Sequence, residues 1–309
     1  MHRRGPLRTT PAPAPLAVQW HTVVMPSVPD TAIHLAGDTY VVPGLTNAGY
    51  IAGLGIDTSE DETAYEGVPL ELLAITHGHA DHFSIAHILH DSGARVIAAR
   101  DDAAMVENPD INIRGMFSWA KPSDKMTTKL FRGIGCAVDG YIEEFNDPRA
   151  TAIPLPGHTL GHHGFLTADG VLFTGDALYQ RELWEQHPLP YAIDPGMVVA
   201  SLERIRGVPC EWVVPAHGQP VRRTEAEEHI DFHITQVRRT AELLLHGLQD
   251  GMTTEGAVAF ISRELGLVEN QAVYWLAVTD VKGYLGELLG RGLIEFSVRD
   301  HVGWWQMVR

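Results

Sequence analysis

The segment Ile75–Phe83, ITHGHADHF, concentrates three histidines and an aspartate within six positions. They are His77, His79, Asp81 and His82, separated by a glycine and an alanine. Alternate residues at a strand end can point the same way, so the first two histidines could hold one cation. Asp81 and His82 would then be left to hold a second. The structural alternative is that Asp81 is only the N-cap of the next helix. The pattern predicts a metal-binding loop.

Three later segments place another ligand-type side chain directly after an apolar strand. They are LPGHT with His158, LFTGD with Asp176 and VVPAHG with His217. Strand ends of this kind are where α/β and related folds gather their functional residues. A solvated strand end could carry any one of them by chance. Their occurrence together, in order after the histidine loop, indicates a shared metal site.

The elements that must position these side chains alternate between strands and helices. The apolar runs that predict strands and hairpins are 16–25, 31–42, 49–58, 67–76, 94–99, 150–159, 162–178 and 210–218. Helices are predicted at 82–93, 101–108 and 195–207. Residues of about 111–150 interrupt this alternation, so we interpret them as a partly helical insertion.

The pattern changes after Pro220. Thr224 and Glu227 predict a capping box that opens a long helix. Further helical patterns end in two strands that suggest a β-wing; the segments are 224–249, 253–265, 270–290 and 293–308. We therefore expect three parts: a disordered tail at 1–16, a catalytic domain at 17–222 and a small, mostly helical domain at 223–309.

Composition restricts the class of protein. The 309 residues include only two cysteines, which supports no disulfide framework and suits a reducing cytoplasm. The formal net charge of -16 disfavours nucleic acid as a partner unless a local basic patch exists. No apolar run approaches the ~18 residues of a membrane helix. We expect a cytoplasmic protein that does not insert into membranes.

The ordered set H-x-H-x-D-H, G-H-T, G-D and H-G resembles the metallo-β-lactamase superfamily over roughly residues 30–220. The resemblance implies an α+β fold, a four-layer αβ/βα sandwich of two mixed sheets with the site at one edge. It also matches Asp57, in GIDT, to a strand-end aspartate that supports the histidine loop. Ser59 stands where the family usually has glycine, which puts the local geometry in question.

The resemblance also implies a ligand set for each of two metals. His77, His79 and His158 would hold one metal, Asp81, His82 and His217 the other, with Asp176 bridging them. One of the nearby His162 and His163 is expected to orient a ligand by a hydrogen bond.

Two cations roughly 3.5–4 Å apart can hold a water between them, lower its pKa and polarise a substrate oxygen. Asp81 and Asp176 would offset part of the positive charge, and an aspartate near the water can accept its proton. We therefore predict a hydrolase that uses a metal-bridging hydroxide. The cofactors expected are two divalent transition metals, zinc first, with iron or manganese as alternatives.

The substrate is narrowed by Asp176 and Tyr179. A bridging aspartate without a cysteine ligand resembles the glyoxalase II, lactonase and nuclease branches rather than true β-lactamases. In the lactonase branch a tyrosine at the offset of Tyr179 contacts the substrate oxygen; packing at the sheet edge is the alternative. We predict cleavage of an ester, thioester or lactone. The alternatives are a phosphodiesterase or endoribonuclease of the same fold, a mononuclear iron persulfide dioxygenase, and a non-catalytic metal-bound binding protein.

The insertion carries basic and aromatic residues in an otherwise acidic chain. Trp119, Lys121, Lys125 and Lys129 are candidate substrate contacts, if this segment is a lid over an anionic acyl substrate. The same residues could stack a nucleic acid strand. Amphipathic helices that cover the core, with solvated lysines, are the structural alternative.

The C-terminal part resembles the winged-helix-like appendage of some members. Over 252–309, five Lys or Arg stand against seven Asp or Glu, a net charge of -2, so the basic footprint of a nucleic-acid module is missing. Its aromatic side chains are expected to pack a small core, cover one wall of the active site or form a homodimer interface. They are Trp275, Tyr284, Trp304 and Trp305.

Overall fold

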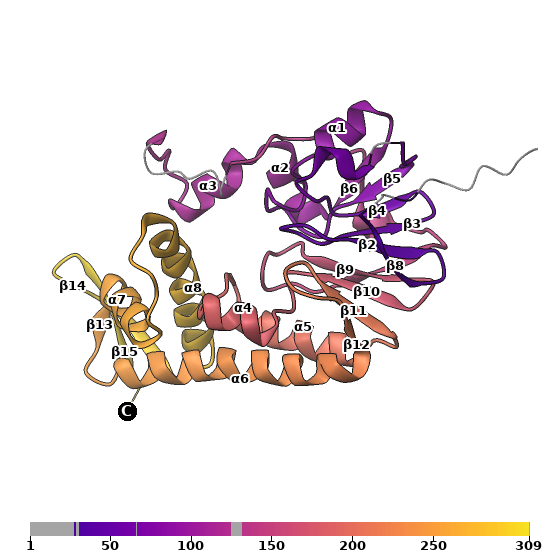
Figure 1. The fold of residues 1–309 in the computed structure, drawn as a ribbon. Coiled ribbons are helices and arrows are strands. Elements are labelled where there is room, and N and C mark those ends of the chain that lie inside the picture. Colours follow the sequence, from indigo (N-terminus) through magenta and orange to yellow (C-terminus); the bar gives the residue numbers. More distant parts are fainter. Residues whose placement is uncertain (1–27, 29–30, 66, 125–131, 309) are drawn as a thin grey trace, which may run out of the picture.

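Two β-sheets stack face to face, with helices on both outer sides (Figure 1). The computed structural model describes residues 28, 31–65, 67–124 and 132–308. The predicted tail at 1–16, the predicted strand at 16–25, Lys125 and Lys129 lie outside these residues.

The first sheet has seven strands in sequence order. They are β1 (Ile33–Ala36), β2 (Thr39–Val42), β3 (Ala48–Ile51), β4 (Leu54–Ile56), β5 (Leu72–Ala74), β6 (Arg95–Ala98) and β7 (Gly140–Tyr141). The first four pair antiparallel, and β4 to β7 run parallel. Helices α1 (Ala86–Asp91) and α2 (Arg100–Glu107) pack on it through a buried cluster that includes Leu73, Leu89 and Val106. Short 3₁₀ turns occupy Glu62–Tyr65 and Ile142–Glu144.

The second sheet has the order β12-β11-β10-β9-β8. Its strands are β8 (Ala150–Pro154), β9 (His163–Thr167), β10 (Val171–Gly175), β11 (Trp212–Pro215) and β12 (Val221–Arg222). Helices α4 (Arg181–Gln186), α5 (Pro195–Gly207) and α6 (Arg223–Gly247) follow on this side of the molecule (Figure 1). A buried hydrophobic layer that includes Leu54, Phe165 and Phe173 fills the space between the sheets. This order of helices, sheet, sheet and helices confirms the predicted α+β four-layer sandwich.

The C-terminal part contains α7 (Thr254–Glu264), α8 (Gln271–Gly290) and a small sheet. That sheet has the order β13-β15-β14, from Met252–Thr253, Val302–Met307 and Ile294–Arg299. One hydrophobic cluster continues from Leu172 of the second sheet through Ile230 of α6 to Leu285 of α8. The boundary near residue 222 and the likeness to a winged helix stay predictions.

The predicted capping box at the start of α6 is wrong. The helix begins at Arg223, directly after β12, and the Glu225 carboxylate accepts the backbone N–H of Arg222 at 3.1 Å. Glu227 instead forms ion pairs with Arg206 and Arg223. The helix thus begins one residue before Thr224, immediately after the two-residue strand β12.

In the described part of the insertion, an α-helix packs away from the two sheets. Helix α3 (Asp110–Met116) lies against α8, and the rings of Phe117 and Trp275 have centroids 4.1 Å apart. The insertion and the C-terminal helices therefore meet. No helix in the described part of the chain is both long and apolar enough to cross a membrane.

Candidate metal centre

The fold brings the seven predicted ligands to one edge of the two sheets. His77 and its neighbours follow β5, while His158, Asp176 and His217 follow β8, β10 and β11. Strands β8, β10 and β11 run in the same direction, because β9 pairs antiparallel with β8 and β10, and β10 pairs parallel with β11. Their carboxyl ends therefore meet, opposite the end of β5.

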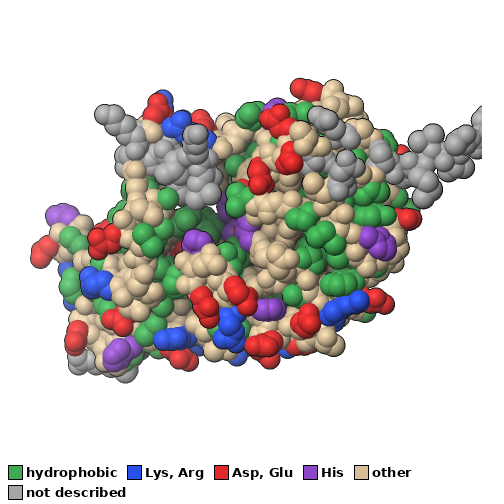
Figure 2. All heavy atoms as spheres, in the orientation of Figure 1, with side chains coloured by type: hydrophobic (Ala, Val, Ile, Leu, Met, Phe, Trp, Pro, Cys, Tyr) green, Lys and Arg blue, Asp and Glu red, His purple; other side chains and the backbone are tan. Residues whose placement is uncertain are grey.

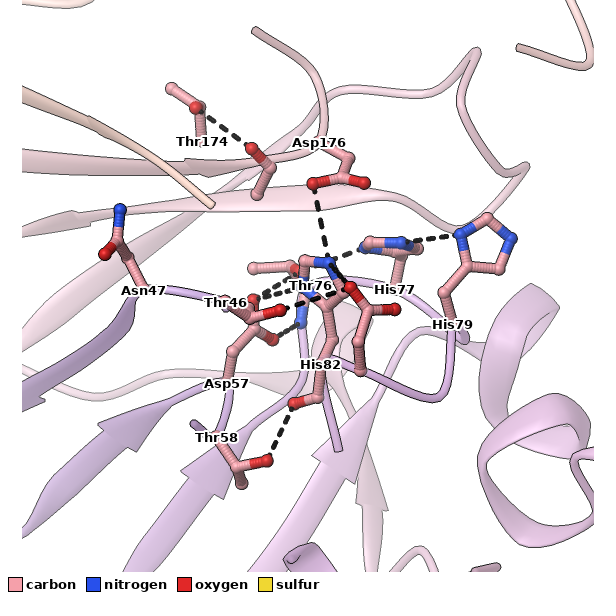
Figure 3. A network of polar contacts seen from close by, with 12 residues as sticks. Thr46, Asn47, Asp57, Thr58, Thr76, His77, His79, His82, Thr174 and Asp176 are labelled. Atoms are coloured by element: carbon pink, nitrogen blue, oxygen red, sulfur yellow. Dashed lines mark hydrogen bonds and ion pairs between the residues drawn. The ribbon is translucent and has the colours of Figure 1, made fainter. Parts of the chain in front are cut away.

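Three histidines converge on one side of the site. His79 Nδ1 lies 2.9 Å from His77 Nε2 and 2.8 Å from His158 Nε2. His158 Nε2 lies 3.4 Å from Asp176 Oδ2. Figure 3 shows the rings of His77 and His79 side by side below Asp176. The grouping is the one that the resemblance implied for the first metal.

Asp81, His82 and His217 form the neighbouring group. Asp81 Oδ2 lies 3.4 Å from His217 Nε2 and 3.6 Å from His82 Nε2. The second oxygen of Asp176, Oδ1, lies 3.4 Å from His82 Nε2 and 3.5 Å from His217 Nε2. Each carboxylate oxygen of Asp176 thus faces a different group, an arrangement compatible with the bridging role that the resemblance implied.

The donor atoms fit divalent cations. Four donors around a tetrahedral zinc, with bonds of about 2.1 Å, lie about 3.4 Å from one another. The second group has nearly this spacing. His82 Nε2 and Asp176 Oδ1 are buried and have no hydrogen-bond partner within the described ranges. Such atoms are costly to leave unpaired, and a cation between them would satisfy both.

The outer nitrogens of three ligand histidines are held by acceptors. A hydrogen bond at Nδ1 fixes the tautomer and directs Nε2 toward the cluster. The acceptors are the Asp57 carboxylate for His82, the Tyr191 carbonyl for His158 and the Leu45 carbonyl for His217, at 2.8, 2.8 and 2.7 Å.

Asp57 supports the histidine loop despite the neighbouring Ser59. Its carboxylate accepts the backbone N–H and the hydroxyl of Thr76, both at 2.7 Å, besides the His82 contact. The residue has a φ of 55°, a left-handed conformation that aspartate tolerates better than most residues. The serine at position 59 therefore does not prevent Asp57 from supporting the histidine loop.

His162 makes the orienting contact expected of one of the two histidines. Its Nε2 accepts the backbone N–H of Asp176 at 3.0 Å. His163 instead donates from Nδ1 to the Gly161 carbonyl at 2.8 Å. His162 is thus the one of the pair that fixes the backbone of a predicted ligand.

Sequence reasoning missed Asp102, a fully buried residue of α2. Its carboxylate accepts the N–H of Gly78 at 2.9 Å, the hydroxyl of Thr159 at 2.5 Å and the N–H of Gly161 at 2.9 Å. One side chain therefore ties the loop of His77 to the loop of His158.

The electrostatics of the cluster favour ionised carboxylates. Burial raises the pKa of Asp176, but His217, His82 and His158 together hold it well below its usual range. Burial lowers the pKa of His217, and Asp176 with Asp81 raises it to about 10. Burial lowers the pKa of His158 to about 3. The first group thus offers neutral imidazoles, while a cation in the second group would displace protons.

A cavity of about 660 Å³ opens from the cluster toward the C-terminal helices. His79, Asp81, His158, Asp176 and His217 form its polar end. Figure 2 shows histidine side chains deep in this hollow, with hydrophobic side chains around it. A small molecule that enters the cavity would reach the candidate ligands directly.

Some of the predicted substrate residues line the cavity and others do not. Tyr179 lines the cavity, and its hydroxyl donates to Asp176 Oδ2 at 3.0 Å. Trp119 is 70% exposed, and neither it nor Lys121 is among the residues that line the cavity. Lys121 faces a separate depression beside Arg114. The roles proposed for all of these residues, and for Lys125 and Lys129, stay predictions.

Comparison with known proteins shows which family the chain resembles. The model of the metallo-beta-lactamase superfamily matches residues 43–217, more than half of the chain. A hydroxyacylglutathione hydrolase of Vibrio cholerae is 32% identical over 111 residues, 36% of this chain and 34% of that protein. The N-acyl homoserine lactonase AttM of Agrobacterium fabrum is 27% identical over 148 residues, 47% of this chain and 53% of that protein. The chain thus spans about a third to a half of these relatives.

Two solved structures share the fold over most of their length. A metallo-beta-lactamase family protein from Thermus thermophilus has a TM-score of 0.65 at 16% identity, covering 88% of this chain and 99% of that chain. A beta-lactamase domain protein from Burkholderia ambifaria has a TM-score of 0.59 at 18% identity, covering 91% and 95%. Both alignments extend beyond the residues matched by the family model.

Proposed function

Because the chain belongs to the metallo-β-lactamase superfamily, we propose that it is a hydrolase that binds two divalent metal ions and cleaves an ester, thioester or lactone. The observation that carries this proposal is the carboxylate of Asp176. Its two oxygens face two separate groups of ligand-type atoms. The names of the two relatives, a hydrolase of hydroxyacylglutathione and a lactonase, support the same chemical class.

The chain's own residues would perform three tasks. Divalent metals, when bound, would supply Lewis acidity and a nucleophilic water at neutral pH. His162 and Asp102 hold the backbone of the ligand loops, so the donor atoms are positioned before substrate arrives. Tyr179 offers a protonated hydroxyl at the cavity wall, beside the position that a substrate oxygen would take.

The phosphodiesterase alternative receives less support. Binding of a nucleic acid strand rests on Lys and Arg near its phosphates. Among the described residues, no Lys or Arg lines the cavity at the candidate metal centre. An acyl compound needs no such side chain.

Metal analysis coupled to a substrate panel tests the proposal. Purified protein should contain close to two transition metals per chain, and Asp176→Ala should lose at least one, since its carboxylate serves both groups. Glu182→Ala, an exposed carboxylate at the start of α4, should keep both metals. Wild type should hydrolyse at least one class among uncharged thioesters, esters and lactones.

Two outcomes would contradict the proposal. Full activity with a single metal would favour the mononuclear iron chemistry named above. Cleavage of phosphodiesters or RNA, with no activity on any acyl compound, would favour the nuclease alternative.

A further inference from the structure

The cavity has a polar end and an apolar end. The apolar end lies away from the candidate metal ligands and is built by three separate parts of the chain. Its main side chains are Met116 of α3, Leu183 of α4, Leu189 of the segment after α4, and Leu267, Val273 and Leu276 around the start of α8. Half of these come from the C-terminal part of the chain, Val273 and Leu276 from α8 and Leu267 from the segment between α7 and α8, and this part carries no predicted metal ligand.

The side chains that line the cavity disfavour a charged group in its apolar end. Besides histidines and the two aspartates of the metal cluster, Glu185 is the only acidic or basic side chain among the described lining residues, and it is exposed at the rim. Asn112, Gln186 and His187 also line the cavity, but none of them carries a fixed charge. A charged group taken into the apolar end would lose its hydration without gaining a partner of fixed opposite charge. An uncharged, apolar group would instead be favoured there.

The wall of the apolar end is preformed. Met116 and Ile113 of α3 are buried against Ala272 and Leu276 of α8. The neighbouring contact of Phe117 with Trp275 fixes the same pair of helices. A pocket of several hundred Å³ with such a wall suits a small ligand that fills it without ordering the protein first.

We propose that the C-terminal helices form the binding site for an uncharged, apolar acyl chain of the substrate, with the scissile carbonyl at the metal end. The inference rests on the proposed function and names the acyl class that function would act on. It concerns only the acyl part of the substrate. Lys121 lies outside the cavity, so the contact of the basic insertion with an anionic substrate stays a separate prediction. An anionic part of a substrate, if present, belongs to the leaving group at the open rim.

Acyl-chain length gives the kinetic test. We would assay thioesters of the uncharged thiol N-acetylcysteamine from acetyl to decanoyl. Burial of each added methylene is expected to raise kcat/KM by about fourfold until the cavity is filled. Val273→Trp, which fills the apolar end, should lower the ratio of kcat/KM for decanoyl to kcat/KM for acetyl by about tenfold or more. Leu289→Trp, on the exposed face of the same helix, is the matched control.

A binding measurement separates the inference from catalysis. Metal-stripped wild type and Leu289→Trp should bind n-decanol in titration calorimetry, and Val273→Trp should bind it at least about tenfold more weakly. Thermal unfolding of each variant shows whether it is folded. If Val273→Trp does not fold, Val268→Glu replaces it, because Val268 lines the cavity but is 67% exposed.

The results distinguish the two proposals. Decanol binding that depends on Val273, without hydrolysis of any acyl compound, would support the apolar site and contradict the proposed reaction. Hydrolysis with the same kcat/KM from acetyl to decanoyl would overturn the inference and leave the reaction standing. An equal loss for short and long chains in Val273→Trp would also overturn it.

Discussion

At the scale of single residues, we propose that Tyr179 acts on substrate and does not only pack at a sheet edge. Its ring is buried, yet its hydroxyl reaches the cavity and donates to Asp176. Burial first, and then the charge of Asp176, raises the pKa of the hydroxyl well above its ordinary value. The phenol therefore stays protonated at neutral pH and can donate a hydrogen bond to a substrate oxygen.

Tyr179→Phe should lower kcat on an acyl substrate by about 100-fold, since it removes a positioned proton donor. Metal content should not change, because the hydroxyl is not a predicted ligand. Tyr191→Phe removes the other tyrosine hydroxyl of the same cavity and should alter kcat less than about threefold. Kinetics and metal analysis of both variants check this. An unchanged kcat in Tyr179→Phe would return the residue to a packing role.

At the scale of elements, the candidate site depends on α2, which supplies no metal ligand. Asp102 of this helix holds the His77 loop after β5 and the His158 loop after β8. These loops come from different sheets. The helix therefore fixes the distance between them, and with it the spacing of the first ligand group.

Asp102→Ala should lower metal affinity by about 10- to 100-fold, the usual cost of losing a group that orients ligands. Its neighbour Asp101 is exposed on the same helical turn, so Asp101→Ala is the matched control and should bind metal as wild type does. Competition with a chelator of known affinity measures the difference. Equal metal affinities for the two variants would contradict the role of Asp102 in holding the two ligand loops together.

The sequence predicted most strands of the two sheets and the strand ends that carry candidate ligands, because each of these ends an apolar run at a glycine or a polar residue. The two-residue strands β7, inside the predicted insertion, and β12 were not predicted. Asp102 escaped notice for a physical reason. A pair of aspartates in the first turn of a helix is ordinary, since it faces the positive end of the helix dipole. The contacts that make Asp102 different join it to Gly78 and Gly161, which lie 24 and 59 residues away in the chain. No local pattern records them.

At the scale of the whole molecule, α8 is connected to the metal cluster by a short series of contacts. Asp280 is fully buried in α8, and its Oδ1 accepts the backbone N–H of Ala192 at 2.7 Å. The carbonyl of the preceding Tyr191 accepts the Nδ1–H of His158 at 2.8 Å. In the sequence analysis, Asp280 was only one of the seven acidic residues counted over 252–309. Its contact with the backbone of Ala192, far away in the chain, could not be predicted from a local pattern.

Asp280→Asn should become more stable relative to wild type as pH rises. Burial raises the pKa of Asp280 well above its usual value. Above about pH 4 the unfolded carboxyl is ionised while the folded one keeps its proton, so wild-type stability falls with pH by at most about 1.4 kcal/mol per unit. Asparagine does not titrate, and its oxygen can still accept the Ala192 N–H.

Urea unfolding of metal-stripped protein between about pH 4.5 and 8 measures this difference. Asp280→Ala, which lacks the acceptor, should be less stable than Asp280→Asn throughout. A difference between Asp280→Asn and wild type that does not vary with pH would contradict a buried, protonated Asp280.

The cavity joins a reactive end from the two sheets to an apolar end from the insertion and the C-terminal helices. Substitutions can therefore change one end of the cavity without changing the other. Substitutions around the start of α8 would alter which molecules are accepted while every ligand loop stays as it is. If the proposed acyl site is correct, exchange of the C-terminal segment between relatives would change substrate selectivity in one step.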